Sequence, residues 1–412
     1  MRLLRETDFL LLGVALLTVL LGITMIYSAT FYSENEALKA AWQRQSFFAL
    51  IALLLILSIV FIPNKVLYGL AYPLYGLSLL TLLMVLVWGS GSGDLAARWL
   101  VVGPVRLQPS ELAKITTIIA LAHYLADYSR ERINSLGVFL GALLIPLVPM
   151  ALVVRQPDLG TAISFGAPFF PMLYWAGMRR LYIFFVISPL FSVVFAFEQF
   201  FQTPFLFAAF IIISAVVVHF LLAKLWITLT LLGVNLSAGL VTVYLWNSLL
   251  EYQKKRILIL LDPDSDRLGD GWNIIQSKIA IGSGGLRGKG FLGGTQPELE
   301  FLPAAHTDFI FSVIGEELGF IGALVVLALF VFLIGRAFYI GSIVNSRFLS
   351  FVAIGLGSML TFHVFVNIGM TIGVLPVTGL PLPFLSYGGS SLLANCIAIG
   401  LLMHIYTNRH EY

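Results

Sequence analysis

Residues 276–309 read QSKIAIGSGGLRGKGFLGGTQPELEFLPAAHTDF. This run is rich in glycine and charge, and its last four residues, HTDF, stand directly before a long apolar stretch. It closes a polar segment, residues 250–308, that separates apolar sequence on both sides. A membrane protein can place its chemistry in a long loop that ends in an acid where the chain re-enters the membrane. Asp308 is therefore a candidate catalytic residue, and a helix-capping role is its alternative.

The composition indicates the class of protein. Hydrophobic residues make up 59% of the 412-residue chain and charged residues only 11%, whereas soluble domains carry about 25% charged residues. The net charge of +3 is too small to suggest nucleic acid as a partner. The single cysteine, Cys396, excludes an intrachain disulfide, and the six histidines show no metal-ligand spacing. We predict a polytopic membrane protein that does not bind nucleic acid.

Apolar windows long enough to cross about 30 Å of hydrocarbon predict an all-α protein with about twelve transmembrane helices and a large extracytoplasmic loop. Short loops with basic residues alternate with loops poor in them, which places both termini in the cytoplasm and residues 250–308 outside. The first apolar run is interpreted as a retained span rather than a signal peptide. We expect one transmembrane domain, residues 1–412, that contains an extracytoplasmic catalytic loop. The predicted spans are residues 8–29, 46–62, 66–88, 110–127, 136–154, 159–177, 181–200, 204–223, 226–249, 309–335, 348–372 and 385–406.

Polar residues around the start of the fourth predicted span form a second candidate cluster. Arg98 and Trp99 precede the span, and an interfacial anchor is the alternative role for Trp99. Glu111 and Lys114 lie three residues apart and so share a helix face. Lys114 falls about one turn into the membrane, where charged groups are costly and are usually functional or mutually paired. A structural Glu111–Lys114 ion pair is therefore the alternative to a role in function.

Three more clusters reach the same predicted face. Asp158 follows a proline at a helix start, where capping is its alternative role. Residues 282–290, GSGGLRGKG, do not match the P-loop pattern, but their backbone and Lys289 suit a lipid pyrophosphate, with a solvated loop as the alternative. Residues 373–391 contain three prolines and four glycines. Such a segment cannot be regular helix at membrane depth, so it is expected to be buried in protein or to line a cavity.

The chemistry of an outward-facing acid beside basic loops is that of group transfer. A carboxylate that is ionised at neutral pH can accept a proton from a sugar hydroxyl as the hydroxyl attacks. Nearby cations can receive the charge of the leaving group. Glycosyl transfer from a lipid-linked donor fits these requirements, although the chemistry alone does not single it out.

Taken in order, these clusters resemble the SEDS family of peptidoglycan glycosyltransferases (RodA, FtsW and SpoVE), and RodA more than FtsW. The resemblance covers nearly the whole chain. It implies a SEDS-like core of ten helices, to which this chain adds a helix pair near residues 181–249. The matching motifs are residues 98–99 (RW), 108–114 (QPSELAK), 156–161 (QPDLGT), 252–256 (YQKKR), 276–285 (QSKIAIGSGG), 294–296 (GTQ), 306–311 (HTDFIF), 316–319 (EELG) and 376–391.

The resemblance implies an enzyme that polymerises lipid II into glycan strands on the outer face of the bacterial cytoplasmic membrane during cell elongation and shape maintenance. Undecaprenyl pyrophosphate would be released. Asp308 matches the acid that is essential in the family, and Glu300 matches a loop position linked to activation. Ala304 replaces a glutamate that is usual in the family, so no role of that glutamate applies here. We expect these residues to bind substrate: Arg98, Trp99, Glu111, Lys114, Asp158, Lys289 and His306.

The resemblance also implies partners: a class B penicillin-binding protein that crosslinks the strands, other elongasome components, the lipid II substrate and membrane lipid. No cofactor is certain, and a divalent cation, Mg²⁺ or Mn²⁺, is the only candidate. Two other functions stay open. The many spans and the broken backbone near residues 376–383 are also features of transporters, here a lipid II flippase. A non-catalytic scaffold for the penicillin-binding protein is the other alternative.

Overall fold

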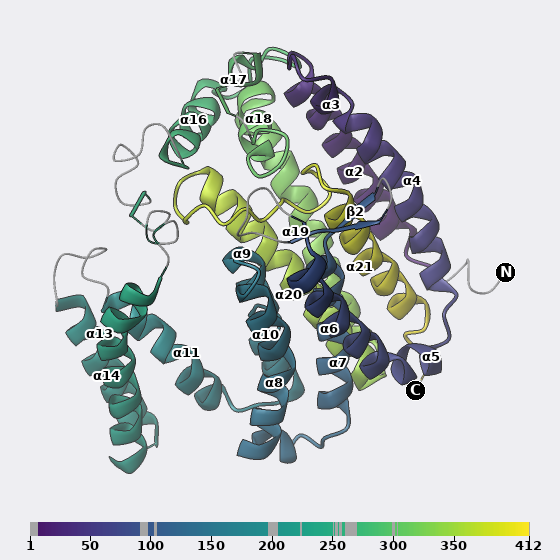
Figure 1. The fold of residues 1–412 in the computed structure, drawn as a ribbon. Helices are drawn as coiled ribbons and strands as arrows, with labels where there is room; N and C mark the ends of the chain where they lie inside the picture. The colour runs from purple at the N-terminus through teal and green to yellow at the C-terminus, as the bar shows by residue number, and fades with distance from the viewer. Residues whose placement is uncertain are drawn as a thin grey trace. The chain divides into compact units, whose positions relative to one another are not determined.

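The chain folds almost entirely into helices, and a single two-stranded hairpin is its only sheet among the described residues (Figure 1). The hairpin pairs β1 (Leu100–Val102) with β2 (Val105–Leu107) in antiparallel register. The prediction of an all-α polytopic membrane protein is confirmed. This computed structural model describes residues 7–90, 98–102, 105–196, 205–222, 225–249, 251, 254, 258–259, 270–298, 301–302 and 304–411.

Two compact units make up the chain. The first contains Met1–Gly177 and Asn273–Tyr412, and the second contains Met178–Trp272. The second unit includes the predicted additional helix pair, and its helices pack on one another through Ser192, which donates to the backbone oxygen of Asn235 at 2.8 Å. A single transmembrane domain with a catalytic loop at residues 250–308 stays a prediction. The helices of the second unit are α11 (Arg180–Phe195), α13 (Phe205–Leu222) and α14 (Leu225–Ser248).

Every predicted span contains helix, but three of them are broken. The window at residues 66–88 divides into α5 (Asn64–Gly69) and α6 (Ala71–Trp88). The window at residues 159–177 divides into α9 and α10, and the window at 309–335 divides into α18 and α19 at Gly319, whose φ is +67°. Eight helices among the described residues are long and apolar enough to cross a membrane. The total of twelve spans stays a prediction. The candidate spans are Phe9–Thr30, Glu36–Val60, Ala71–Trp88, Leu136–Val154, Leu225–Ser248, Gly319–Ile343, Arg347–Thr371 and Gly389–Thr407.

The last two helices form the centre of the first unit. Their spanning windows are 83% buried for α20 and 78% for α21, compared with 22–39% for the other six. Small residues permit this close packing: a Cβ on Gly355 of α20 would overlap Ile118 of α7. Helices α2, α4, α6, α8 and α19 expose many apolar side chains. The elements of the first unit are α2 (Phe9–Thr30), α3 (Glu36–Lys39), α4 (Ala41–Val60), α5 (Asn64–Gly69), α6 (Ala71–Trp88), α7 (Pro109–Ala126), η1 (Arg132–Asn134), α8 (Leu136–Val154), α9 (Leu159–Gly166), α10 (Phe169–Ala176), α16 (Asp270–Ser283), α17 (Thr295–Glu298), α18 (Ile310–Glu317), α19 (Gly319–Ile343), α20 (Arg347–Thr371) and α21 (Gly389–Thr407).

Residues 372–388 join α20 to α21 without helix, and residues 382–386, in the second half of this connector, are buried. Protein side chains satisfy its backbone. The Gln45 amide donates to the Ser386 oxygen and accepts from the Gly388 nitrogen, each at 3.1 Å. Asn367 donates to the Leu380 oxygen at 2.8 Å. The prediction of non-helical backbone is confirmed for residues 373–388, whereas Gly389–Ser391 already belong to α21. Burial in protein is confirmed for residues 382–386, where lipid could not satisfy the backbone.

Polar contacts tie the helices together at the opposite end of the first unit. Arg336 of α19 donates to the Asp8 carboxylate at 2.6 Å. Arg347, at the start of α20, donates to the backbone oxygen of Tyr128 at 2.8 Å. These basic side chains lie at the helix ends remote from residues 372–388. We call the end that carries residues 372–388 the connector end.

The glycine-rich turn after α16 packs backbone against backbone. A Cβ on Gly284 would overlap the backbone oxygen of Gly315, and a Cβ on Gly288 would overlap that of Glu317. The amides of Lys289 and Gly290 donate to the oxygens of residues 316 and 317, both at 3.0 Å. Close approach to α18 therefore accounts for these glycines, which the sequence alone had associated with a pyrophosphate.

This packing predicts the effect of adding a single methyl group. Gly284→Ala should destabilise the protein by about 1–3 kcal/mol, because the backbone at Gly315 must move. Gly282→Ala is the matched control, since no atom lies within 4 Å of the position that its Cβ would take. Thermal unfolding of the two purified variants measures the difference. Equal unfolding temperatures would contradict the close packing.

Candidate active site

Asp308 lies at the connector end, immediately before α18. Its Oδ2 is 3.6 Å from the position that a Cβ would occupy on Gly379, whose φ is +73°. Its backbone oxygen accepts from the Asn367 amide at 2.9 Å, and the same amide donates to Leu380. Phe309, not Asp308, is the N-cap of α18, and no acid stands in the first turn of the helix. The Asp308 carboxylate lies beside the connector, and its catalytic role stays a prediction.

His306 anchors the same loop to the connector. Its backbone oxygen accepts from the Tyr387 amide at 2.9 Å, and the two rings lie 5.7 Å apart. Burial lowers the pKa of His306 below its usual value. The imidazole is therefore neutral at neutral pH, and it can offer a hydrogen bond to a substrate rather than a positive charge.

The lowered pKa of His306 predicts a stability effect with a definite sign. The unfolded chain takes up the proton first, near pH 6.5, so this contribution to stability is complete above about pH 6.5 and is lost as the pH falls through the folded-state pKa. His306→Gln should flatten the fall in unfolding temperature between about pH 7.5 and about pH 5.5. The exposed His410, changed to Gln, serves as the control. If the unfolding temperatures of wild type and His306→Gln fall equally with pH, His306 does not contribute to this pH dependence.

Asp158 is the N-cap of α9 and also a junction between segments. Its carboxylate accepts from the Thr161 amide at 3.2 Å and from the Thr161 hydroxyl at 2.9 Å, so the predicted capping role is confirmed. The same carboxylate lies 3.9 Å from Arg98 Nε and accepts from Gln108 at 3.4 Å. At the second residue of α9, a Cβ on Gly160 would overlap the Thr378 oxygen. The start of α9 therefore packs against the residue that precedes Gly379.

Glu111 and Lys114 form a buried ion pair on α7. Lys114 Nζ lies 2.9 Å from Glu111 Oε1, and the two side chains are only 2% and 3% exposed. Nζ also lies 3.1 Å from Nε2 of His363 on α20. The predicted alternative, an ion pair between Glu111 and Lys114, is therefore confirmed. An additional role in substrate binding stays a prediction.

One face of α20 connects these groups. His363 contacts Lys114, and Asn367, one turn later, holds the Asp308 loop. Sequence reasoning did not identify either residue. A signal existed, because two polar residues four positions apart share one face of an otherwise apolar helix.

The other predicted residues have different surroundings. Lys289 Nζ lies 2.6 Å from Glu316 Oε1, whose side chain is fully buried. Glu316 also accepts from the Thr295 amide and hydroxyl, at 2.9 and 2.7 Å. The Lys289 side chain therefore links the glycine-rich turn to α18, and its contact with substrate stays a prediction. Trp99 is half-buried and pairs with Ser90 through backbone hydrogen bonds of 2.8 and 3.1 Å. Glu300 lies outside the described residues.

The described residues contain no group of three His, Cys, Asp or Glu side chains that could hold a metal ion. The acidic side chains described above are engaged by other protein groups: Asp158 by Thr161 and Gln108, Glu111 by Lys114, and Glu316 by Lys289. These three acids do not include Asp308, so a divalent cation stays a prediction and we derive no step through one.

Comparison with known proteins identifies the family. The model of the FtsW/RodA/SpoVE cell cycle proteins matches residues 8–207 and 202–411. The chain belongs to this family. It is 40% identical over 350 residues to peptidoglycan glycosyltransferase MrdB of Escherichia coli K12, covering 84% of this chain and 80% of the relative. It is 37% identical over 425 residues to peptidoglycan glycosyltransferase RodA of Treponema pallidum, covering 97% of both.

Solved structures of the FtsW/RodA/SpoVE family share the fold. A chain from a peptidoglycan synthase complex that coordinates polymerization and crosslinking superposes with a TM-score of 0.73 at 30% identity, covering 98% of this chain and 99% of that one. The rod shape determining protein RodA of Thermus thermophilus superposes with a TM-score of 0.63 at 28% identity, covering 98% of both. The likeness extends over the whole chain.

Proposed function

We propose that this member of the FtsW/RodA/SpoVE family is a peptidoglycan glycosyltransferase that polymerises lipid II during cell elongation and shape maintenance. Relatives named as peptidoglycan glycosyltransferases align with 84% and 97% of the chain. The observation that carries the proposal is the placement of Asp308. Its carboxylate faces the Gly379 turn, and Asn367 and His306 fix its loop to the connector.

Asp308 acts as the general base. Its carboxylate accepts the proton of the attacking hydroxyl on the acceptor sugar, while the hydroxyl oxygen forms a bond to the anomeric carbon of the donor. The bond from that carbon to the diphosphate breaks, and the electron pair leaves with undecaprenyl pyrophosphate. Arg98, whose side chain is 32% exposed beside Asp158, is a candidate to receive the leaving charge.

The reaction is placed on the outer face of the bacterial cytoplasmic membrane, with both chain termini in the cytoplasm. The arrangement of charge supports this orientation. Arg336 and Arg347 lie at the end of the first unit remote from Asp308, and basic residues favour the cytoplasmic side.

A class B penicillin-binding protein is the proposed partner, together with other elongasome components. The solved synthase complex, which coordinates polymerization with crosslinking, supports this choice. A polymerase and a transpeptidase in one complex would crosslink strands as they emerge.

The test is glycan synthesis from lipid II by the full-length protein, reconstituted in liposomes with its class B partner. Polymer resolved on a gel is the expected result. Lipid II that crosses the bilayer without forming polymer would instead identify a transporter. If a folded preparation that contains the partner gives neither polymer nor transport, the protein is a non-catalytic scaffold and the proposal is wrong.

A further inference from the structure

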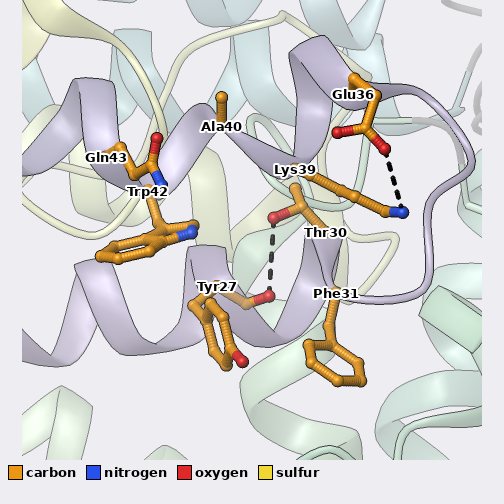
Figure 2. A pocket seen from close by; sticks show the side chains of 8 residues that line it. All are labelled: Tyr27, Thr30, Phe31, Glu36, Lys39, Ala40, Trp42 and Gln43. Carbon is orange, nitrogen blue, oxygen red and sulfur yellow. Dashed lines mark hydrogen bonds and ion pairs between the residues drawn. The ribbon is translucent and has the colours of Figure 1, made fainter.

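A cavity opens at the connector end of the first unit, lined by residues of α2, α3 and α4. Its volume is ≈ 480 Å³, within the range of about 300–1,000 Å³ that is usual for small-molecule sites. It lies where α3 joins the end of α2 to the start of α4 (Figure 2). None of the candidate active-site residues lines it. We propose that this cavity is a carbohydrate subsite that holds an N-acetylated sugar ring of the glycan, an inference that rests on the proposed function.

Three aromatic rings form the apolar part of this subsite. The rings of Tyr27 and Trp42 lie 5.7 Å apart and nearly perpendicular, at 88°, and the rings of Tyr27 and Phe31 lie 5.5 Å apart at 63°. A pyranose presents apolar C–H groups on its faces and hydroxyls on its rim. Aromatic faces accept the C–H groups, while the amide of Gln43 at the edge of the cavity can bond hydroxyls.

The charge of the lining selects a neutral ligand. Its only ionic groups are Glu36 and Lys39, which lie 3.4 Å apart and are 86% and 44% exposed. An ion pair this exposed contributes little to stability, so both groups are available to hydroxyls and acetamido groups. Because the two charges cancel, the cavity offers no net attraction to a pyrophosphate or an anionic lipid headgroup. A sugar ring fits this lining better than either anion.

One wall of the subsite continues into the loop that carries Asp308. Phe291 stacks on Tyr27 with ring centroids 6.5 Å apart, and the Tyr32 hydroxyl donates to the Leu292 oxygen at 3.3 Å. Glu316, near the end of α18, binds Lys289, which precedes Phe291 by two residues, and α18 begins two residues after Asp308. The subsite and the proposed base are therefore built on one connected segment, which is why glycan is the expected occupant.

Direct binding tests the subsite. The probe is the N-acetylglucosamine tetrasaccharide, and the measurement is saturation-transfer NMR on the full-length protein in nanodiscs. Wild type should give a signal that Trp42→Ala and Phe31→Ala each reduce by at least about threefold. Phe31 is 41% exposed, so its truncation should not disturb folding even if that of Trp42 does. Trp88→Ala is the matched control, because this 73%-exposed tryptophan ends α6 at the same end of the unit but does not line the cavity.

A polymerisation assay shows whether the sugar in the subsite belongs to the growing strand or to the lipid-linked precursor. Shorter strands from Phe31→Ala at an unchanged rate of first-bond formation would assign the subsite to the growing strand. A raised KM for lipid II at unchanged strand length would assign it to the lipid-linked precursor. The inference is wrong if Trp42→Ala and Phe31→Ala both give the wild-type signal. It is also wrong if Trp88→Ala loses as much signal as they do, because a loss at any exposed aromatic residue is the behaviour of membrane-interface anchors. If wild type makes no polymer, the proposed function fails, while the tetrasaccharide result still decides whether the cavity binds sugar.

Discussion

Asp308→Asn is expected to lower glycan polymerisation by about 10²–10⁴-fold, the contribution usual for a general base. The amide has nearly the shape of the carboxylate but cannot accept the proton of the acceptor hydroxyl. The backbone of residue 308 should still accept from Asn367, and Phe309 should still be the N-cap residue of α18, so the loop should keep its fold. The measurement is the initial rate of polymer formation from lipid II by the purified protein with its class B partner.

The matched control for Asp308 is Glu34→Gln, which removes an exposed acid between α2 and α3. Its polymerisation rate should equal that of wild type. Both variants should unfold at the wild-type temperature and co-purify with the partner, which separates loss of chemistry from loss of structure. If Asp308→Asn polymerises as fast as wild type, another group is the base.

The sequence predicted those parts of the fold that depend on local composition. Apolar windows located helix in every predicted span, because hydrocarbon requires continuous helix wherever backbone is exposed to lipid. The prolines and glycines of residues 373–391 predicted the non-helical connector for the same reason, although residues 389–391 already belong to α21. The breaks within three spans were not predicted. The break at Gly319, for example, depends on packing against the backbone of Gly288, which lies far away in the sequence.

The site was predicted less completely, because its contacts join distant parts of the chain. Lys114 meets His363 across 249 positions, and Asp308 is held by Asn367 across 59. No local pattern reveals such pairs. The glycine-rich turn shows the same limit. Residue 284 must be glycine because α18 lies against it, and only the fold reveals that neighbour.

Lys114→Met should destabilise the protein by about 3–5 kcal/mol, because it leaves the Glu111 carboxylate buried without its cation. The Nζ of Lys114 also contacts Nε2 of His363, so the loss should loosen α7 from α20. Thermal unfolding of the purified protein measures the effect. The double variant Glu111→Gln, Lys114→Met should recover most of the lost stability, since it removes both buried charges and nearly keeps the side-chain volumes. A single variant as stable as wild type would contradict a stabilising role for the pair.

The same double variant separates the two interpretations of Lys114. If the ion pair only joins α7 to α20, restored stability should bring restored polymerisation, because nothing that touches substrate has been removed. If Lys114 binds the diphosphate of the substrate, the double variant should fold like wild type and still polymerise slowly, with a raised KM for lipid II. The structure favours the first outcome, because Nζ is already engaged by Glu111 and His363 and the side chain is 2% exposed. Slow polymerisation by a stable double variant would instead require α7 and α20 to move apart when substrate binds.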